Sequence, residues 1–222
     1  VVWTLRDMWP FTGGCHYSFD CKNYEKGCGK CSNLKSNSDY DLSSYVLNRK
    51  IKSIPVNMKI VGISDWISNS ALKSKIFKNF DITTISNSID TIRFYPVAKQ
   101  QARKFLNIAT DKKIILIGSQ NSSDLYKGFS KFIEATSFLN MENYLVCFFG
   151  NLDKRSEFNF NYISFGYVDS PEILRNIYAA ADVFVAPSIM EAFGKTIAES
   201  MLCGTPAVCF DSTGPKDIVS HK

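Results

Sequence analysis

Two glutamates, Glu191 and Glu199, stand eight positions apart on either side of Gly194. The local pattern predicts a strand end, a turn at Gly194 and a helix that begins near Lys195. A helix N-terminus offers unpaired N–H groups and a partial positive charge, which suit a phosphate or diphosphate. A glycine lets that group approach the backbone closely. Glu199 could then accept hydrogen bonds from vicinal hydroxyls such as those of a ribose, and Glu191 could face a sugar beyond the phosphates. The segment could therefore hold a sugar nucleotide at three points.

Two glutamates at this spacing are also common on solvated helix faces, so the flanking sequence has to decide. Residues 178–188 read YAAADVFVAPS and residues 204–214 read GTPAVCFDSTG. Together with the glutamates, they resemble the E-x7-E signature of the retaining glycosyltransferases of family 4, the group 1 transferases. The resemblance implies that Glu191 orients the donor sugar and that Glu199 holds the ribose. It further assigns donor binding to Phe193, Gly194, Lys195 and Thr196.

A polar loop and Lys127 follow the apolar run 114–118. Next to a predicted helix start, a lysine can neutralise a departing diphosphate, which gains charge in the transition state. The resemblance assigns this role to Lys127, for which the alternative is a surface lysine. Many family members also carry an arginine in the loop before it, and residues 119–126 contain none. Tyr167 and Val168 resemble the segment that lines the nucleotide base through backbone contacts.

Residues 4–17, TLRDMWPFTGGCHY, resemble a subgroup of these transferases in bacterial exopolysaccharide and capsule pathways. In that subgroup the position of Arg6 is typically a histidine near the donor sugar. Arginine can bind a phosphate through two hydrogen bonds but cannot exchange protons at neutral pH, so the substitution departs from the pattern. Asp7 fits the pattern, with a helix or turn cap as the alternative. The resemblance implies that Arg6 and Asp7 complete the catalytic cleft from the other domain.

Four of the seven cysteines lie close together in the spacing C-x5-C-x6-C-x2-C: Cys15, Cys21, Cys28 and Cys31. Residues 27–31, GCGKC, have the composition of a tight zinc-binding turn. Four thiolates could complete a tetrahedral structural zinc site, and free or redox-active thiols or disulfides are the alternatives. Asp39 and Asp41 form a D-x-D pair in a Ser- and Asn-rich loop, where we expect no metal. The resemblance implies that catalysis requires no cofactor.

Short apolar runs alternate with helical patterns along the chain, which predicts an α/β fold with parallel sheets. The runs lie at residues 60–63, 82–85, 114–117, 144–149, 183–185 and 207–210, and the clearest helical patterns at 129–138, 171–181 and 195–203. The resemblance implies the GT-B fold of two Rossmann-like domains. We expect residues 1–92 to be the C-terminal part of the acceptor-side domain, with a Cys-rich insertion at 15–31. Residues 93–222 are expected to be the nucleotide-sugar-binding domain, truncated at its C-terminus.

The net charge of +5 is unevenly distributed, because Asp65 is the only acidic residue between Leu42 and Phe80. This basic stretch could meet anionic lipid headgroups, or it could be an ordinary solvated surface. Aromatic residues lie in apolar runs rather than among the lysines, so we expect no nucleic-acid partner. No apolar run approaches the roughly 20 residues that span a bilayer, and no signal peptide opens the sequence. We therefore expect a cytoplasmic protein, with peripheral contact to the inner face of the membrane where the basic surface binds lipid.

These features together predict a retaining hexosyltransferase. It would move a hexose from a UDP- or GDP-sugar to a hydroxyl of a growing, lipid-linked glycan in bacterial surface polysaccharide biosynthesis. One alternative is another GT-B enzyme, a sugar-nucleotide epimerase. The other is a non-catalytic nucleotide-sugar-binding subunit descended from a transferase, which Arg6 and the missing loop arginine leave open.

Overall fold

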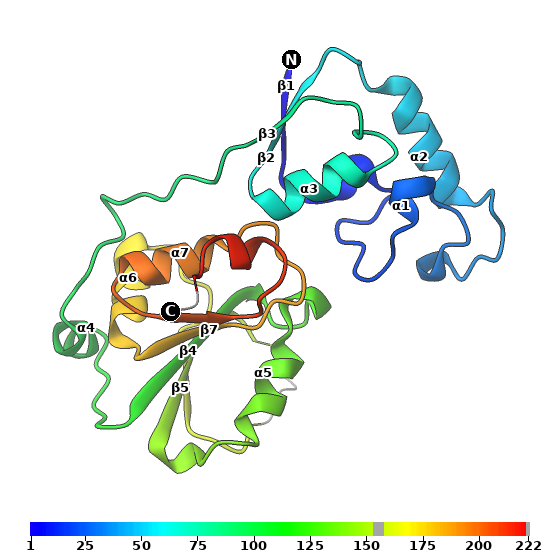
Figure 1. Cartoon of the computed structure of the whole chain (residues 1–222). Helices are drawn as coiled ribbons and strands as arrows, with labels where there is room; N and C mark the ends of the chain where they lie inside the picture. The colour runs from blue at the N-terminus through cyan, green and yellow to red at the C-terminus, as the bar shows by residue number, and fades with distance from the viewer. Residues whose placement is uncertain (153–157, 221–222) are drawn as a thin grey trace. The chain divides into compact units, whose positions relative to one another are not determined.

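The computed structural model describes residues 1–152 and 158–220 and divides the chain into two compact units. The first unit is Val1–Asn87 and the second is Ser88–Lys222, whereas the sequence placed the boundary after residue 92. Figure 1 shows both units as strands covered by helices. Each unit is described by itself below.

The first unit is built on a parallel three-stranded sheet of order β1-β2-β3. The strands are β1 (Val2–Leu5), β2 (Lys59–Gly62) and β3 (Ile82–Thr84), and the longer helices are α2 (Leu42–Ser53) and α3 (Asp65–Lys73). Asp41 starts α2 by accepting hydrogen bonds from the N–H groups of Ser43 and Ser44, which satisfies donors at the helix start. Ser64 caps α3 in the same way. Leu5, Ile60, Ile67 and Phe77 are among the core residues of this unit.

Between β1 and α2 the chain forms only short helical turns. They are η1 (Trp9–Phe11), α1 (Asn23–Lys26) and η2 (Ser32–Leu34). The four clustered cysteines belong to this connection, and so do Asp39 and Asp41. Asp41 is the cap of α2, and a carboxylate at the start of a helix needs no other partner to explain its place.

The second unit contains a parallel five-stranded sheet of order β6-β5-β4-β7-β8. The strands are β4 (Lys113–Asn121), β5 (Tyr144–Asn151), β6 (Tyr162–Ser164), β7 (Val183–Ala186) and β8 (Ala207–Cys209). The helices are α4 (Lys99–Phe105), α5 (Phe129–Thr136), α6 (Pro171–Ala180) and α7 (Lys195–Leu202), with short turns η3 (Leu125–Lys127), η4 (Met141–Asn143) and η5 (Gly214–Asp217). The alternation of strands and helices confirms the predicted α/β class.

Helices cover both faces of this sheet, as Figure 1 shows for α5 on one side and α6 and α7 on the other. Successive strand residues point to opposite faces. Ile115 and Ile117 of β4 accordingly pack in one buried cluster with Phe132 of α5. Ile114 and Leu116 pack in the other cluster, which also contains residues of α6 and α7. A strand buried on both faces must be apolar at every position, which explains the continuous apolar run of β4.

The longest helix in the described part of the chain is α2, with 12 residues. No helix within residues 1–152 and 158–220 has the length and apolar character needed to cross a bilayer.

Candidate active site

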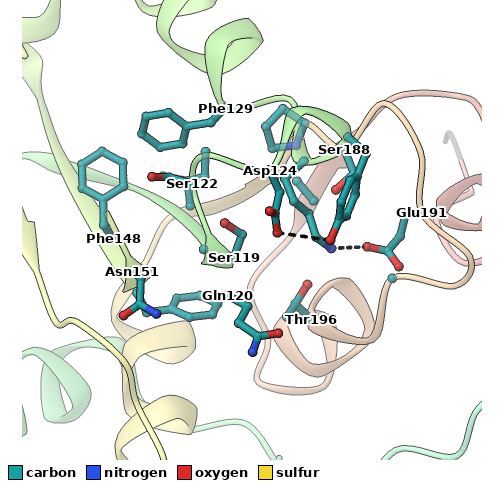
Figure 2. Close-up of a pocket in the computed structure, with 18 of the residues that line it drawn as sticks. Ser119, Gln120, Ser122, Asp124, Phe129, Phe148, Asn151, Ser188, Glu191 and Thr196 are labelled. Atoms are coloured by element: carbon teal, nitrogen blue, oxygen red, sulfur yellow. Dashed lines mark hydrogen bonds and ion pairs between the residues drawn. The ribbon is translucent and has the colours of Figure 1, made fainter. Parts of the chain in front are cut away.

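A pocket of about 270 Å³ opens at the carboxyl ends of the strands of the second sheet. It is lined by residues from the ends of β4, β5 and β7, from the loops that follow them and from the first turn of α7. Lys127 is one of them, and Figure 2 labels others, among them Ser119, Asp124, Ser188, Glu191 and Thr196. In open parallel sheets this edge is the usual place for a ligand, because the loops there converge.

Lys127 and Glu191 form an ion pair in the wall of this pocket. Lys127 Nζ lies 2.6 Å from Glu191 Oε2, and the two side chains are only 24% and 20% exposed. The dashed line that ends on Glu191 in Figure 2 marks this contact. A partly buried ammonium group beside a carboxylate is a preformed pair of opposite charges, and each charge is available to a ligand that reaches the pocket. The two residues assigned to the diphosphate and to the sugar therefore occupy one place.

Backbone contacts between the loops that carry this ion pair fix their separation. The carbonyl of Tyr126 accepts hydrogen bonds from the N–H groups of Ile189 and Met190, at 2.8 and 3.2 Å. Gly128 follows in the left-handed conformation, with φ +65, and a Cβ there would lie 1.9 Å from the carbonyl oxygen of Pro187. Only glycine avoids both the strain and the collision.

Gly194 precedes α7 with φ 99 and ψ 53. Its carbonyl accepts the N–H groups of Ile197 and Ala198. The N–H groups of the first helical residues have no acceptor within a helix and point out of its start. Gly194 and Thr196 both line the pocket, so this end of α7 faces it. An anion in the pocket would therefore meet N–H donors on one side and the Lys127 ammonium on the other.

Glu191 is held by its own backbone as well as by Lys127, because its carbonyl oxygen accepts the N–H of Gly214 at 2.9 Å. Phe193 is buried in the turn between Glu191 and α7, and Lys195 is exposed. Neither of these two predicted donor-binding residues lines the pocket. They shape the turn and the helix start instead.

Glu199 lies beside the pocket rather than in its lining, and its side chain is only 7% exposed. The hydroxyl of Tyr178 donates a hydrogen bond to Glu199 Oε2 at 3.0 Å, and Lys195 Nζ lies 3.7 Å from Oε1. Burial raises the pKa of Glu199, while the Tyr178 hydrogen bond and Lys195 oppose the rise. Burial, and then the neighbouring carboxylate, raise the pKa of Tyr178 well above its usual value, so its hydroxyl keeps its proton at neutral pH.

The polar residues at the end of β4 and directly after it were not identified from the sequence as part of the site. Ser119 and Gln120 at the end of β4, Ser122 just after it and Asn151 at the end of β5 all line the pocket. In the loop after β4 the Tyr126 hydroxyl donates to Asp124 Oδ2 at 3.1 Å. Burial, followed by this contact with Asp124, raises the pKa of Tyr126. The available signal was positional, since a polar loop directly after a buried parallel strand is a frequent ligand site.

The segment expected to line the nucleotide base lies at the end of β6. Gly166 has a positive φ of 64, and its carbonyl accepts the N–H of Gly150 at 2.7 Å. Tyr167 is 65% exposed, and Val168 packs against the core. Neither Tyr167 nor Val168 lines the pocket described above. Their predicted role therefore stays a proposal.

Arg6 and Asp7 belong to the first unit and directly follow β1. Arg6 Nη1 donates to Asn87 Oδ1 at 3.4 Å. Asp7 Oδ1 accepts the N–H of Trp9, and Asp7 Oδ2 lies 2.7 Å from His16 Nδ1. Asp7 thus supports the turn at η1, which was the alternative considered for it, and also holds the His16 ring. His16 was not identified from the sequence, and only its partner across the loop draws attention to it.

The clustered cysteines carry free thiols. Cys15, Cys28 and Cys31 are half-buried, and Cys21 is exposed. Within residues 1–152 and 158–220, no group of three or more His, Cys, Asp or Glu side chains is arranged to hold a metal ion.

The model of the protein family described as "Glycosyl transferases group 1" matches residues 98–222, which is more than half of the chain. The chain belongs to this family of glycosyltransferases.

Individual relatives agree with the family. A glycogen synthase of Caldicellulosiruptor saccharolyticus is 27% identical over 176 residues, which cover 74% of this chain and 36% of that protein. An O-antigen chain mannosyltransferase B of Escherichia coli is 48% identical over 54 residues, 24% of this chain and 14% of that protein. The structure of Anabaena Alr3699/HepE in complex with UDP and glucose has a TM-score of 0.68 at 17% identity, over 99% of this chain and 55% of that one.

The likeness to HepE shows the fold, and the predicted GT-B architecture of two Rossmann-like domains is confirmed. The chain spans about a third of the glycogen synthase and about half of the HepE structure.

Proposed function

We propose that this chain is part of a retaining hexosyltransferase that takes a hexose from a UDP- or GDP-sugar. The observation that carries the proposal is the Lys127–Glu191 ion pair, 2.6 Å long, in a pocket that also receives the start of α7. The positive charge and the N–H donors of this pocket suit the diphosphate of a sugar nucleotide, and the carboxylate suits the hydroxyls of its sugar.

Transfer requires the bond between the sugar and the diphosphate to break, and the leaving diphosphate gains negative charge as it does so. In the proposed reaction the Lys127 ammonium and the N–H groups at the start of α7 stabilise that charge. Glu191 turns its carboxylate to the sugar hydroxyls. Because these groups are already in place, little reorganisation is needed at the moment of reaction, which is where such electrostatic stabilisation is most effective.

Retention of configuration is part of the proposal. In it no side chain attacks the sugar, in contrast to glycosidases that use paired carboxylates. The leaving phosphate accepts the proton of the acceptor hydroxyl on the face from which it departs. Catalysis then depends on donor positioning and charge stabilisation, and the proposal requires no cofactor.

The proposed nucleotide contact is Glu199, whose Oε2 is occupied by Tyr178 while Oε1 is the oxygen closer to Lys195. A ribose hydroxyl would bind Oε1. The UDP bound in the HepE structure supports a uridine nucleotide as the first donor to test. A GDP-sugar is the alternative donor.

The proposed acceptor is a lipid-linked glycan of a bacterial surface polysaccharide. The name of the Escherichia coli relative, an O-antigen chain mannosyltransferase, supports this class. The basic residues of α2 and of the end of α3, among them Arg49, Lys52 and Lys73, would bring the enzyme to the inner, anionic face of the cytoplasmic membrane.

Calorimetric titration of UDP, GDP, ADP and dTDP into the chain tests the donor site. We expect one nucleotide to bind selectively and Glu199→Ala to weaken that binding by about tenfold or more. Glu134→Ala, which removes an exposed glutamate of α5, is the matched control and should bind like the parent. Binding of no nucleotide, or equal binding by Glu199→Ala, would contradict the proposed site.

An activity assay with the sugar nucleotide that carries the selected base distinguishes the transferase from its alternatives. Transfer to a glycan acceptor supports the proposal. Conversion of the donor sugar without an acceptor indicates an epimerase. Binding without turnover in a full two-domain protein indicates a non-catalytic subunit, an alternative that Arg6 leaves open because its guanidinium cannot exchange protons.

A further inference from the structure

The carboxyl ends of the strands of the first sheet carry a group of polar and aromatic side chains. The strands β1, β2 and β3 run parallel, so the loops that follow them leave the sheet at the same edge. Arg6 and Asp7 follow β1, Trp66 lies in the first turn of α3 after β2, and Asn87 comes after β3. Arg6 Nη1 donates to Asn87 Oδ1 at 3.4 Å, which joins the first of these loops to the last. In an open parallel sheet this is the edge at which a ligand is expected.

The loop that carries His16 folds back onto this edge and is held there on both sides. The carbonyl of His16 accepts the N–H of Met8 at 2.9 Å, and Met8 itself is only 1% exposed. The hydroxyl of Ser18 donates to Met8 Sδ at 3.6 Å. The ring of Tyr17 lies against the ring of Trp66, with the two centroids 6.4 Å apart. The backbone at His16 is therefore fixed relative to the strand ends.

The side chains of His16 and Asp7 form a hydrogen-bonded pair, and the chemistry of the pair determines which atom donates. Asp7 Oδ1 accepts the N–H of Trp9 at 2.8 Å, and Asp7 Oδ2 lies 2.7 Å from His16 Nδ1. An ionised carboxylate can only accept hydrogen bonds, so His16 Nδ1 carries the hydrogen. In the neutral imidazole the other nitrogen, Nε2, then carries none and is a hydrogen-bond acceptor.

Most of the imidazole is open to a ligand. The His16 side chain is 71% exposed, whereas the Asp7 side chain that holds its Nδ1 is 28% exposed. An exposed pair of this kind contributes little to stability, so stability does not account for the fixed ring. A carboxylate that holds one imidazole nitrogen is the arrangement by which proteins present the other nitrogen to a reactant or a ligand. Arg6, directly before Asp7, is also exposed and adds the N–H donors of its guanidinium.

We propose that the Asp7–His16 pair is a carbohydrate-binding site, in which His16 Nε2 accepts a hydrogen bond from a hydroxyl of the acceptor glycan. A sugar suits this edge, because its hydroxyls donate to Nε2 and accept from a guanidinium such as that of Arg6. The half-buried rings of Tyr17 and Trp66 add apolar surface next to these polar groups. That the sugar belongs to the acceptor rests on the proposed function, which assigns the donor to the pocket of the second unit. His16 holds the acceptor without taking its proton, so the proposed proton transfer to the leaving phosphate is unchanged.

Nitrogen NMR of the imidazole rings tests the site directly, because the sequence contains two histidines, His16 and His221. In the whole chain, isotopically labelled at its histidines, we expect His16 to carry its hydrogen on Nδ1. Titration with methyl glycosides of hexoses and N-acetylhexosamines should shift the Nε2 resonance of His16 and leave His221 unchanged. In Asp7→Asn the asparagine amide donates to Nδ1, which moves the hydrogen of the ring to Nε2. This variant should lose the shift although the imidazole is still present.

Two substitutions of His16 separate sugar binding from a structural role. In His16→Asn the side-chain amide replaces the Nδ1–H group and keeps the bond to Asp7, but nothing replaces Nε2. We expect this variant to keep the parent's unfolding midpoint and to bind the glycoside about tenfold more weakly. His16→Gln, whose amide oxygen can take the place of Nε2, should recover part of the binding, and His221→Asn is the control. Once transfer is measured, His16→Asn should raise the KM for the acceptor about tenfold and leave nucleotide affinity unchanged.

The proposal is overturned if His16 carries its hydrogen on Nε2, or if none of the glycosides shifts its resonances. It is equally overturned if His16→Asn binds the glycoside as the parent does. Nucleotide titration of the same chain distinguishes these failures from a failure of the proposed function. Glycoside binding at His16 without any nucleotide binding would refute the transferase and leave the carbohydrate site standing. Nucleotide binding without glycoside binding would leave the donor site standing and refute the role of His16.

Discussion

Tyr178 donates its hydroxyl hydrogen to Glu199 across a distance of 3.0 Å, and both side chains are buried in the second unit. The Tyr178 ring is packed edge to face against Phe94, Phe149 and Phe184, so the position of its hydroxyl is fixed. The hydrogen bond therefore holds one oxygen of the proposed ribose-binding carboxylate and orients the other. This makes Tyr178 a positioning residue, whose role can be separated from that of a simple core residue.

Tyr178→Phe should weaken nucleotide binding about tenfold and cost about 1.5 kcal/mol of stability, because a hydrogen bond to a charged group is lost while the ring packing stays. Calorimetry with the bound nucleotide and denaturant unfolding measure the two effects. Tyr162→Phe, which removes the hydroxyl of a half-exposed tyrosine, serves as the control. A Tyr178→Phe variant that is destabilised but binds nucleotide normally would leave Tyr178 with a purely structural role.

Glu199→Gln should be stabilising relative to the parent, and increasingly so as the pH rises. Burial raises the folded-state pKa of Glu199 above its ordinary value of 4.5, so the folded protein holds this proton more tightly than the unfolded chain. The ionised carboxylate then costs stability above the raised pKa, and this cost vanishes below 4.5. Urea unfolding of both proteins between acid and neutral pH measures the difference. A parent that gains on the variant as the pH rises would refute the assignment.

Lys127→Met should lower the rate of sugar transfer about 100- to 1,000-fold while changing nucleotide affinity much less, because the charge it stabilises develops during bond cleavage. The variant also leaves Glu191 without its ion-pair partner, which could lower the stability of the fold. Denaturant unfolding of Lys127→Met and of Lys127→Met/Glu191→Gln measures how much stability the unpaired carboxylate costs. Lys131→Met removes an exposed lysine paired with Glu134 and is the control. Equal losses in affinity and rate would place Lys127 in ground-state binding instead.

Asp182→Asn should destabilise the second unit by about 3 kcal/mol. The Asp182 side chain is 17% exposed and accepts hydrogen bonds from Lys99, Arg103 and the N–H of Ile114. Although burial would raise the pKa of Asp182, these partners outweigh it and lower the pKa below 3.8. The stability that Asp182 contributes is therefore present above 3.8 and is lost as the pH falls through the lowered value. Glu134→Gln, which removes one partner of a solvent-exposed pair, should change stability much less.

Sequence patterns were sufficient to predict the strands that are buried on both faces of the sheet and the helices that cover them. The run Ile114–Ile117 is apolar at every position and lies in the first half of β4, and the helix that follows Gly194 begins at Lys195 as predicted. In contrast, β6 has three residues, exposed or half-buried, and too little pattern to be recognised. Short edge strands depend on a partner strand that the local sequence does not contain.

The sequence singled out four residues that line the pocket, but not how they are arranged: Lys127, Glu191, Gly194 and Thr196. Lys127 and Glu191 were assigned to different parts of a ligand, and nothing in either local sequence indicates that they form an ion pair across 64 positions. The same holds for Tyr178, which opens the motif at residues 178–188 but whose hydrogen bond to Glu199 could not be predicted from that motif. Contacts between side chains from distant segments arise from tertiary packing, and local residue propensities and motif spacing do not predict them.

All strands of the second sheet pair in parallel, and this has a kinetic consequence. Parallel neighbours cannot be joined by a tight hairpin, so every pairing closes a long loop, and β4 must pair with both β5 and β7. Closing such loops slows folding, because chain entropy is lost before the contacts form. The pocket takes one wall from the loop after β4 and another from the loop after β7. During synthesis it can therefore assemble only once β7 and α7 have left the ribosome, well after its lysine has been made.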